Sequence, residues 1–244
     1  MKYIRRSAER GEANFGWLHS KHSFSFGNYY DKNHMGVSVL RVINDDMVMP
    51  GKGFDEHGHR DMEIISYVIE GTLKHEDSTG NSYKVPAGEI QRMSAGRGVM
   101  HSEFNASKQD KVKFLQIWIQ PNITGIKPSY QQKSIRQKGK LTTLVDPQGK
   151  NNALSINQDA RLSRLILKSG EDFTFNTEQR IGYLHIIKGR LKTDSEQFSA
   201  GDGFAVEPEQ KLKVIADSAI EALWFDLPDV WFLTDLAKYK AILL

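Results

Sequence analysis

The chain has 244 residues, of which 39% are hydrophobic, and its 33 basic and 30 acidic residues give a net charge of +3. This apolar fraction suits the core of one large domain or two ordinary ones, and the balanced charge argues against direct nucleic-acid binding. The sequence contains no cysteine, which excludes disulfides and thiolate metal ligands and leaves His, Asp and Glu as candidate ligands.

The ends of the sequence carry no pattern typical of export or membrane insertion. The opening residues, MKYIRRSAERGEANFGW, lack the apolar run of a signal peptide. No stretch approaches the roughly 18 apolar residues that a membrane-spanning helix needs. We therefore expect a soluble, cytoplasmic protein that does not bind membranes. Residues 6–15 and 229–244 are the only segments with a weak helical pattern.

Strand patterns dominate the rest of the chain. Short runs of alternating or β-branched apolar residues are separated by clusters of Gly, Pro, Asn and Asp, a pattern that favours an all-β sandwich or barrel with few short helices. The runs cover residues 36–44, 63–77, 81–89, 111–121, 162–170, 183–194, 202–208 and 222–228.

A sequence repeat indicates two copies of one β-unit. IEGTLK at 69–74 returns as IKGRLK at 187–192, an offset of 118, and VPAGE at 85–89 is followed at nearly the same offset by FSAGD at 198–202. We predict an N-terminal unit over residues 1–124, a linker over 125–140 and a C-terminal unit over 141–244. The basic, glutamine-rich stretch 127–140 has one aromatic residue and is interpreted as solvated linker.

Two pairs of residues have the spacing of metal ligands. His57 and His59 are separated by one glycine in GFDEHGHRDMEI, and His101 and Glu103 are separated by one serine in GVMHSEFN. Residues two apart on a strand share a face, so each pair can direct both side chains to one point. Three imidazoles and one carboxylate suit Fe, Ni, Cu, Mn or Zn rather than Ca. Either pair alone is a weak motif, and together they predict a metal site.

Other polar residues near these pairs have alternative roles. Glu63 is a candidate fifth ligand, although a carboxylate that orients an imidazole is the favoured interpretation. His75 and Asp77 fall at a predicted hairpin, where we expect them to cap the turn. His19 and His22 lie beside a predicted strand and are expected to be structural rather than ligands.

The second copy lacks the predicted ligands. With the offset of 118, the positions of His57 and His59 are taken by Phe175 and Thr177, and that of Glu63 by Ile181. We therefore expect one metal, in the first unit only.

Four blocks of the first 121 residues resemble the pirin family of the cupin superfamily. They are WLHSKHSFSFGNYY, GFDEHGHRDMEIISYVIEGTLKHEDSTGN, PAGEIQRMSAGRGVMHSEFN and FLQIWIQP, and the bacterial members they resemble are the quercetin 2,3-dioxygenase-like pirins. The likeness is dense over residues 17–121 and thin after 140. It implies a bicupin, two stacked antiparallel β-barrels of jelly-roll type, with one metal in the first barrel.

The resemblance also implies the ligand set. The H-x-H and H-x-E pairs of the family fall on His57, His59, His101 and Glu103, the four residues that the spacing also selects. The usual second-motif histidine of cupins is Gln91 here, and its place is taken ten residues later by His101, a shift that pirins share. Glu63 then lies outside the ligand set.

Two functions follow from the resemblance. The first is a metal-dependent dioxygenase that cleaves flavonols such as quercetin with O₂ and releases carbon monoxide, with Glu103 as ligand and catalytic base for the 3-hydroxyl proton. The alternative is a metal-binding, redox-sensing interaction module for a protein partner. We expect a quercetin 2,3-dioxygenase-like oxidoreductase, a monomer with one divalent metal. Fe(II) is the first choice, and Ni, Cu, Mn and Zn are the alternatives.

Overall fold

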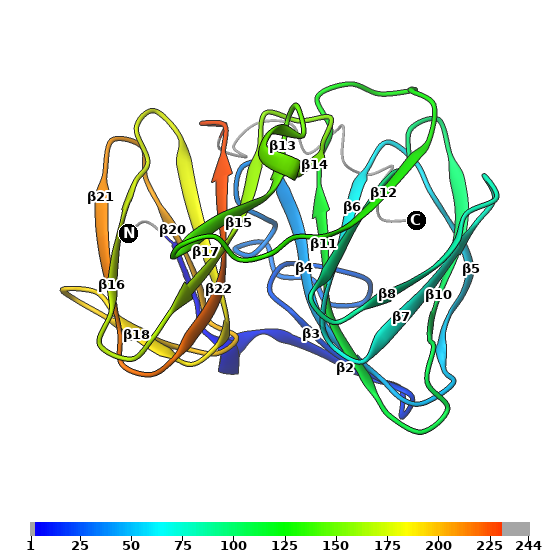
Figure 1. Ribbon diagram of the computed structural model, residues 1–244, viewed down its shortest axis with the longest axis horizontal. Coiled ribbons are helices and arrows are strands. Elements are labelled where there is room, and N and C mark those ends of the chain that lie inside the picture. The colour runs from blue at the N-terminus through cyan, green and yellow to red at the C-terminus, as the bar shows by residue number, and fades with distance from the viewer. Residues whose placement is uncertain (1–2, 231–244) are drawn as a thin grey trace.

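The computed structural model describes residues 3–230, and nearly all of their regular structure is β-strand. The strands form two seven-stranded and two four-stranded sheets. The sheets are stacked in layers, with the two larger sheets in the middle and a smaller sheet on each outer side (Figure 1). Within 3–230, helical structure is limited to two 3-10 turns, η1 Ser7–Glu9 and η2 Lys150–Asn152.

The first unit consists of one large and one small sheet. Its large sheet has the order β12-β9-β6-β11-β4-β3-β2, and its small sheet has the order β5-β10-β7-β8. The large-sheet strands are β2 Gly11–Asn14, β3 Leu18–His22, β4 Leu40–Val48, β6 Glu63–Glu70, β9 Glu89–Ser94, β11 Val112–Ile119 and β12 Ser129–Ser134. The small-sheet strands are β5 Gly53–His59, β7 Thr72–Asp77, β8 Ser82–Pro86 and β10 Val99–Asn105.

The second unit repeats this topology. Its large sheet has the order β1-β20-β17-β22-β15-β13-β14, and its small sheet has the order β16-β21-β18-β19. The large-sheet strands are β1 Tyr3–Arg5, β13 Leu141–Asp146, β14 Leu154–Ser155, β15 Arg161–Leu167, β17 Ile181–Lys188, β20 Gly203–Val206 and β22 Ile220–Leu227. The small-sheet strands are β16 Asp172–Asn176, β18 Arg190–Lys192, β19 Gln197–Ser199 and β21 Lys211–Ala216. The repeated IEGTLK and IKGRLK segments form the equivalent β6–β7 and β17–β18 corners.

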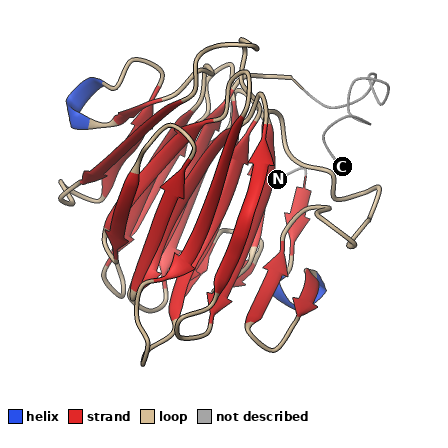
Figure 2. Ribbon diagram, turned by 90° about the vertical axis from the view of Figure 1, so that its right-hand side faces the viewer, coloured by secondary structure: helices blue, strands red, loops and turns tan. Residues whose placement is uncertain are grey.

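The predicted all-β fold is confirmed, whereas closed barrels are not. Each sheet ends in edge strands that pair on one side only, such as β2 and β12 in one sheet and β5 and β8 in the next. Each unit is therefore an open sandwich of two sheets, and Figure 2 shows the strands of the first unit lying side by side. All strand pairs are antiparallel except β13 with β14.

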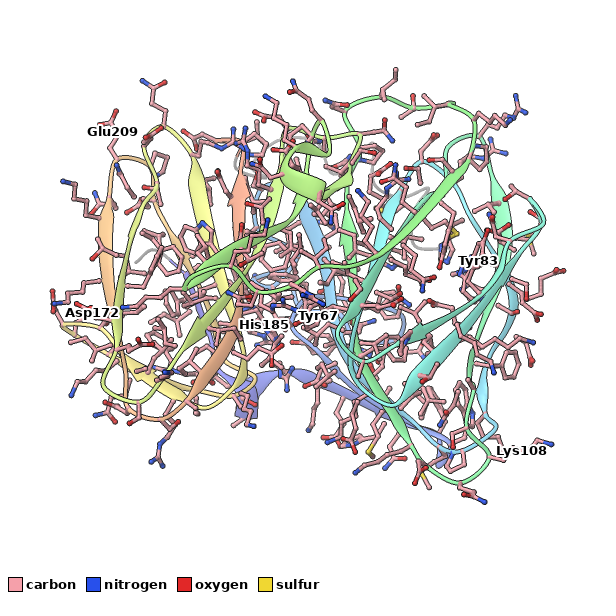
Figure 3. The ribbon with its side chains drawn as sticks, in the orientation of Figure 1. Tyr67, Tyr83, Lys108, Asp172, His185 and Glu209 are labelled. Carbon is pink, nitrogen blue, oxygen red and sulfur yellow. The ribbon has the colours of Figure 1, made fainter. Side chains whose placement is uncertain are left out.

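The largest apolar core lies between the two seven-stranded sheets. The alternation of side chains along a strand sends every second residue into this central layer and the others into the interior of their own unit. The labelled Tyr67 and His185 lie in the middle of the molecule (Figure 3), and the Tyr67 hydroxyl donates to Glu221 Oε1 at 2.5 Å. Core residues from the two units include Ile43, Ile65, Leu115 and Ile117 on one side and Leu162, Tyr183, Leu223 and Phe225 on the other.

Two predicted segments have a different structure. Residues 6–15 form the turn η1 and the strand β2 rather than a helix, because β2 gains a hydrogen-bonded ladder along β3. The stretch 125–140 is not wholly solvated linker, since its residues 129–134 form β12 and pair with β9. Residues 231–244, most of the second predicted helix, lie outside the described part of the chain.

The domain boundaries near 124 and 141 stay a proposal, and two strands pair outside the unit or linker in which the sequence placed them. The N-terminal strand β1 pairs with β20 of the second unit, and β12 occupies the equivalent edge of the first unit. Among the described residues, no helix combines the length and the apolar character that crossing a membrane requires.

Candidate metal centre

Strands β5 and β10 place the two predicted pairs side by side. His101 lies opposite His57 in the antiparallel register, and Val99 lies opposite His59. Between His101 and Glu103 the partner on β5 moves from His57 to Phe54, so three residues of β5 span two residues of β10. The bulge places Phe54 rather than Asp55 opposite Glu103, whereas the alternation along each strand turns both pairs toward the interior of the sandwich.

Gly53 permits the close approach of β5 to β10 at this bulge. A Cβ atom at Gly53 would lie 2.3 Å from the Glu103 carbonyl oxygen and 2.5 Å from Phe104 Cα. Both contacts are with backbone, which cannot move aside without separating the strands. At Gly58 a Cβ atom would instead meet the flexible Met100 side chain, 3.0 Å from its sulfur.

We predict that Gly53→Ala destabilises the protein by about 1–3 kcal/mol through overpacking and also weakens metal binding. Gly58→Ala is the matched control on the same strand and should change both properties much less. Thermal unfolding and metal titration of the two variants test this, and equal melting temperatures would contradict the role of Gly53.

Three imidazoles converge at the centre. The ring centroids of His57, His59 and His101 lie 4.4–4.8 Å apart, and the Nε2 atoms of His57 and His101 are 3.0 Å apart. His57 Nδ1 donates to the Asp55 carbonyl oxygen at 2.7 Å, which leaves the Nε2 lone pair free. His101 is buried, whereas His57 and His59 are half-buried, so solvent reaches the cluster from the β5 side.

The electrostatics keep His59 and His101 neutral. Burial, and then the neighbouring His101 and His57, lower the pKa of His59 to about 3. Burial, and then His57 and His75, lower the pKa of His101 to about 3. Neutral imidazoles are the form that binds metals. The 3.0 Å Nε2 separation also suits two ligands held about 90° apart at about 2.1 Å from one ion, so the residues fit a transition metal.

Glu103 is buried beside His101 and is surrounded by neutral donors. Its Oε1 accepts hydrogen bonds from Ser66 Oγ and Gln91 Nε2, both at 3.1 Å, and its Oε2 accepts one from Gln116 Nε2 at 2.5 Å. The candidate ligand atoms of Glu103, His101 and His75 lie within 4.8 Å of one another, as do those of the three-histidine group. The four predicted residues thus occupy two adjoining groups that share His101.

His75 belongs to this centre, which the hairpin interpretation missed. It is fully buried on β7 opposite Glu103, with its ring 5.3 Å from that of His101, and its Nε2 lies 3.0 Å from Asp77 Oδ2. Asp77 does cap the turn, because its Oδ1 accepts from the Thr79 backbone N–H at 2.8 Å. The alternation Leu73, His75, Asp77 is the sequence signal that places His75 inside.

Glu63 does not orient an imidazole, in contrast to the favoured interpretation. It lies three residues from Ser66 on β6, so its side chain points to the opposite face of the sheet, toward the second unit. There it accepts hydrogen bonds from Ser94 Oγ at 2.9 Å and from Asn157 Nδ2 at 3.0 Å. Arg92 lies 3.9 Å away as its counter-charge. Glu63 therefore helps to join the two units.

His19 and His22 lie outside both ligand groups. His19 is paired with Glu12 on the surface, with 2.7 Å between Nε2 and Oε1. His22 is buried and its ring packs against that of Phe26 at 5.4 Å.

The second unit replaces the donors around Glu103 with apolar side chains. By strand pairing, the row Gln91–Ser66–Gln116 corresponds to the row Phe204–Leu184–Trp224. Phe175, at the position of His57 in the repeat, stacks on the Trp224 ring at 3.9 Å. These residues fill the interior of the second sandwich with an apolar core, in contrast to the polar side chains around Glu103 in the first unit.

Comparison with known proteins identifies the relatives of the chain. The Pirin family model matches residues 4–119, and that of the quercetinase C-terminal cupin domain matches 143–227. A protein named quercetin 2,3-dioxygenase from Escherichia coli K12 is 45% identical over 232 residues, covering 94% of this chain and 100% of that protein. A pirin-like protein of Caulobacter vibrioides is 38% identical over 221 residues, covering 88% and 95%. The crystal structure of the bacterial pirin YhhW from Escherichia coli, in complex with nickel(II), superposes with a TM-score of 0.90 at 44% identity, covering 93% and 99%.

Two stacked β-sandwiches of common topology, with a histidine cluster in one of them, define a protein of the cupin type. Within this class, the sequence identity of 45% and 38% to two relatives, over nearly their full length, identifies the family. The chain belongs to the pirin family. The resemblance to its quercetin 2,3-dioxygenase-like members is likewise confirmed.

Proposed function

We propose that this protein binds one divalent transition metal through His57, His59, His101 and Glu103 and acts as a pirin-type dioxygenase on flavonols such as quercetin. The observation that carries the proposal is the convergence of three imidazoles, with two Nε2 atoms 3.0 Å apart, beside a buried carboxylate. The nickel(II) complex of the related pirin supports the binding of a divalent transition metal. Fe(II) remains our first choice and Ni, Cu, Mn and Zn are alternatives.

The chain's own residues would bind and deprotonate the substrate. A bound metal supplies Lewis acidity and redox chemistry toward O₂. Oε1 of Glu103 accepts two hydrogen bonds and Oε2 accepts one, which leaves one lone pair on Oε2. That lone pair would serve by turns as the metal ligand and as the acceptor of the 3-hydroxyl proton of a flavonol. The three donors around Glu103 hold this carboxylate in place.

Aromatic side chains beside His59 favour a planar aromatic substrate. The Trp118 ring packs edge-on at 5.0 Å from the His59 ring, and Phe26 packs edge-on at 5.3 Å from Trp118. Since His57 and His59 are half-buried, we propose that the substrate enters from the β5 side, along this aromatic wall.

The assay follows loss of the visible absorbance of quercetin under air with protein loaded with Fe(II), Ni(II), Cu(II) or Mn(II). We expect metal-dependent loss together with release of carbon monoxide. If every fully loaded form leaves quercetin intact, the dioxygenase proposal fails and the metal-dependent interaction module becomes the better description.

Fractionation of the native cells tests the expected cytoplasmic location.

A further inference from the structure

We propose that Tyr130, on a strand outside both family matches, is a positioning residue of the metal centre. The first family match ends at residue 119 and the second begins at residue 143, so β12 belongs to neither. Its pairing with β9 nevertheless makes it part of the first unit. This inference rests on the proposed metal site and concerns how that site is held.

The alternation of β12 gives the strand two separate functions. Gln131 and Lys133 point to the second unit, where Ser155 N–H donates to Gln131 Oε1 at 2.9 Å and Lys133 Nζ donates to the Ala153 carbonyl at 2.8 Å. Tyr130 and Gln132 have the opposite direction and share the face of Gln91, which lies opposite Gln132. One face of β12 therefore ties the units together and the other reaches the metal centre.

The hydroxyl of Tyr130 fixes the amide of Gln91. Gln91 Nε2 donates to Ser66 Oγ at 2.9 Å and to Glu103 Oε1 at 3.1 Å, which uses both of its hydrogens. Gln91 Oε1 must then accept, and the Tyr130 hydroxyl lies 2.8 Å away. Without that donor, the buried Gln91 carbonyl oxygen has no hydrogen-bond partner. The side-chain amide is then more stable when it rotates and brings this oxygen toward the neighbouring donors. A turned amide would place oxygen against the Glu103 carboxylate.

Gln132 is the competing acceptor for this hydroxyl. Its Oε1 lies 2.9 Å from the Tyr130 hydroxyl, which has one hydrogen to donate. Gln132 is half-buried and has access to solvent, whereas Gln91 is buried. Because an unsatisfied buried acceptor costs more than a solvated one, the hydrogen favours Gln91.

The ring of Tyr130 also supports the imidazole side of the centre. Its ring centroid lies 4.7 Å from that of His75, with an interplanar angle of 31°, and the Tyr83 ring stacks on it at 5.1 Å. Tyr130 thus contacts Gln91, which donates to Glu103, through its hydroxyl, and it contacts His75, the neighbour of His101, through its ring. At the equivalent edge of the second unit, Ile4 of β1 lies opposite Phe204, so the polar edge strand accompanies the polar interior.

The test compares Tyr130→Phe, which keeps the ring and removes the hydroxyl, with Tyr83→Phe as the matched control. Loss of a group that orients a ligand typically weakens metal binding by 10–100-fold, so we expect Ni(II) affinity to fall by about 10-fold in Tyr130→Phe. Tyr83 is half exposed, and its variant should keep the affinity within about twofold. Ni(II) is titrated in competition with a chromophoric chelator, after circular dichroism has established that each variant is folded.

A double-variant cycle separates positioning from packing. If Tyr130 acts through Gln91, then Gln91→Leu alone must weaken Ni(II) binding, and adding Tyr130→Phe to it must cause no further loss. Independent, additive losses overturn the inference, as does wild-type affinity in either single variant. Wild-type protein that binds no Ni(II) contradicts the metal site itself. Failure to cleave quercetin contradicts only the proposed reaction, because the cycle measures binding.

Discussion

The His57→Ala variant is expected to lose its metal while keeping its fold. His57 is half-buried on β5, so truncation removes little packing, but it deletes the Nε2 atom that lies 3.0 Å from His101 Nε2. Removing a group that only orients a ligand costs 10–100-fold in affinity, and removing a ligand should therefore cost more than about 100-fold. Elemental analysis of purified protein and Ni(II) titration measure this loss.

His19→Ala is the control for the loss of a histidine as such. His19 is a surface residue paired with Glu12 and belongs to neither ligand group. The His19→Ala variant should bind metal as the wild type does. Full metal occupancy in His57→Ala would show that the histidine cluster is not the binding site.

The Glu103→Gln variant is expected to reduce quercetin turnover by about 100- to 10,000-fold, the usual contribution of a general base. It should also lower the free energy of unfolding by about 1–3 kcal/mol. Both carboxylate oxygens of Glu103 accept hydrogen bonds from Ser66, Gln91 or Gln116. An amide in this place turns one acceptor into a donor that faces another donor. Turnover is measured at full metal occupancy and stability by chemical denaturation.

Glu63→Gln provides the matched control on the other face of the same sheet. Glu63 is as buried as Glu103, but it bonds to Ser94 and Asn157 between the units. We expect lower stability with turnover retained. Full turnover in Glu103→Gln would refute its role as the base, and loss of turnover in Glu63→Gln would show that the effect is not specific to the metal centre.

Much of the fold was predictable because strand patterns are local. The alternating run at 63–77, broken by one glycine, became β6 and β7, and Gly71 adopts the positive φ of 80° that such a corner requires. The repeat of this corner at Gly189, with φ of 88°, predicted the second unit. The open edges of the sheets were not predictable, since barrel closure depends on strands far apart in sequence.

The surroundings of the site were less accessible than its histidines. Gln116 and Tyr130 have no ligand spacing, and Gln91 stood out only as the place of a cupin histidine. The register of β9, β11 and β12 brings Gln91 and Gln116 to Glu103 and Tyr130 to Gln91. Glu63 illustrates the same limit, because its distance from His59 suggested a role at the metal although its strand directs it to the other face. Residues 129–134, which form β12, were predicted as part of a linker for a similar reason, because edge strands are often short and polar.

By itself, the sequence determined that the chain forms two related β-units and that one of them carries two closely spaced pairs of candidate ligands. These properties depend on alternation along a single strand, where neighbouring residues face opposite sides and residues two apart face the same side. Only the tertiary structure decided which face of each strand lies inside its own sandwich and which lies between the units. It thereby placed His75 in the metal centre, Glu63 between the two units and the Tyr130 hydroxyl next to the Gln91 side chain. The physical reason is that a strand has two equivalent faces until other strands, distant in sequence, cover them.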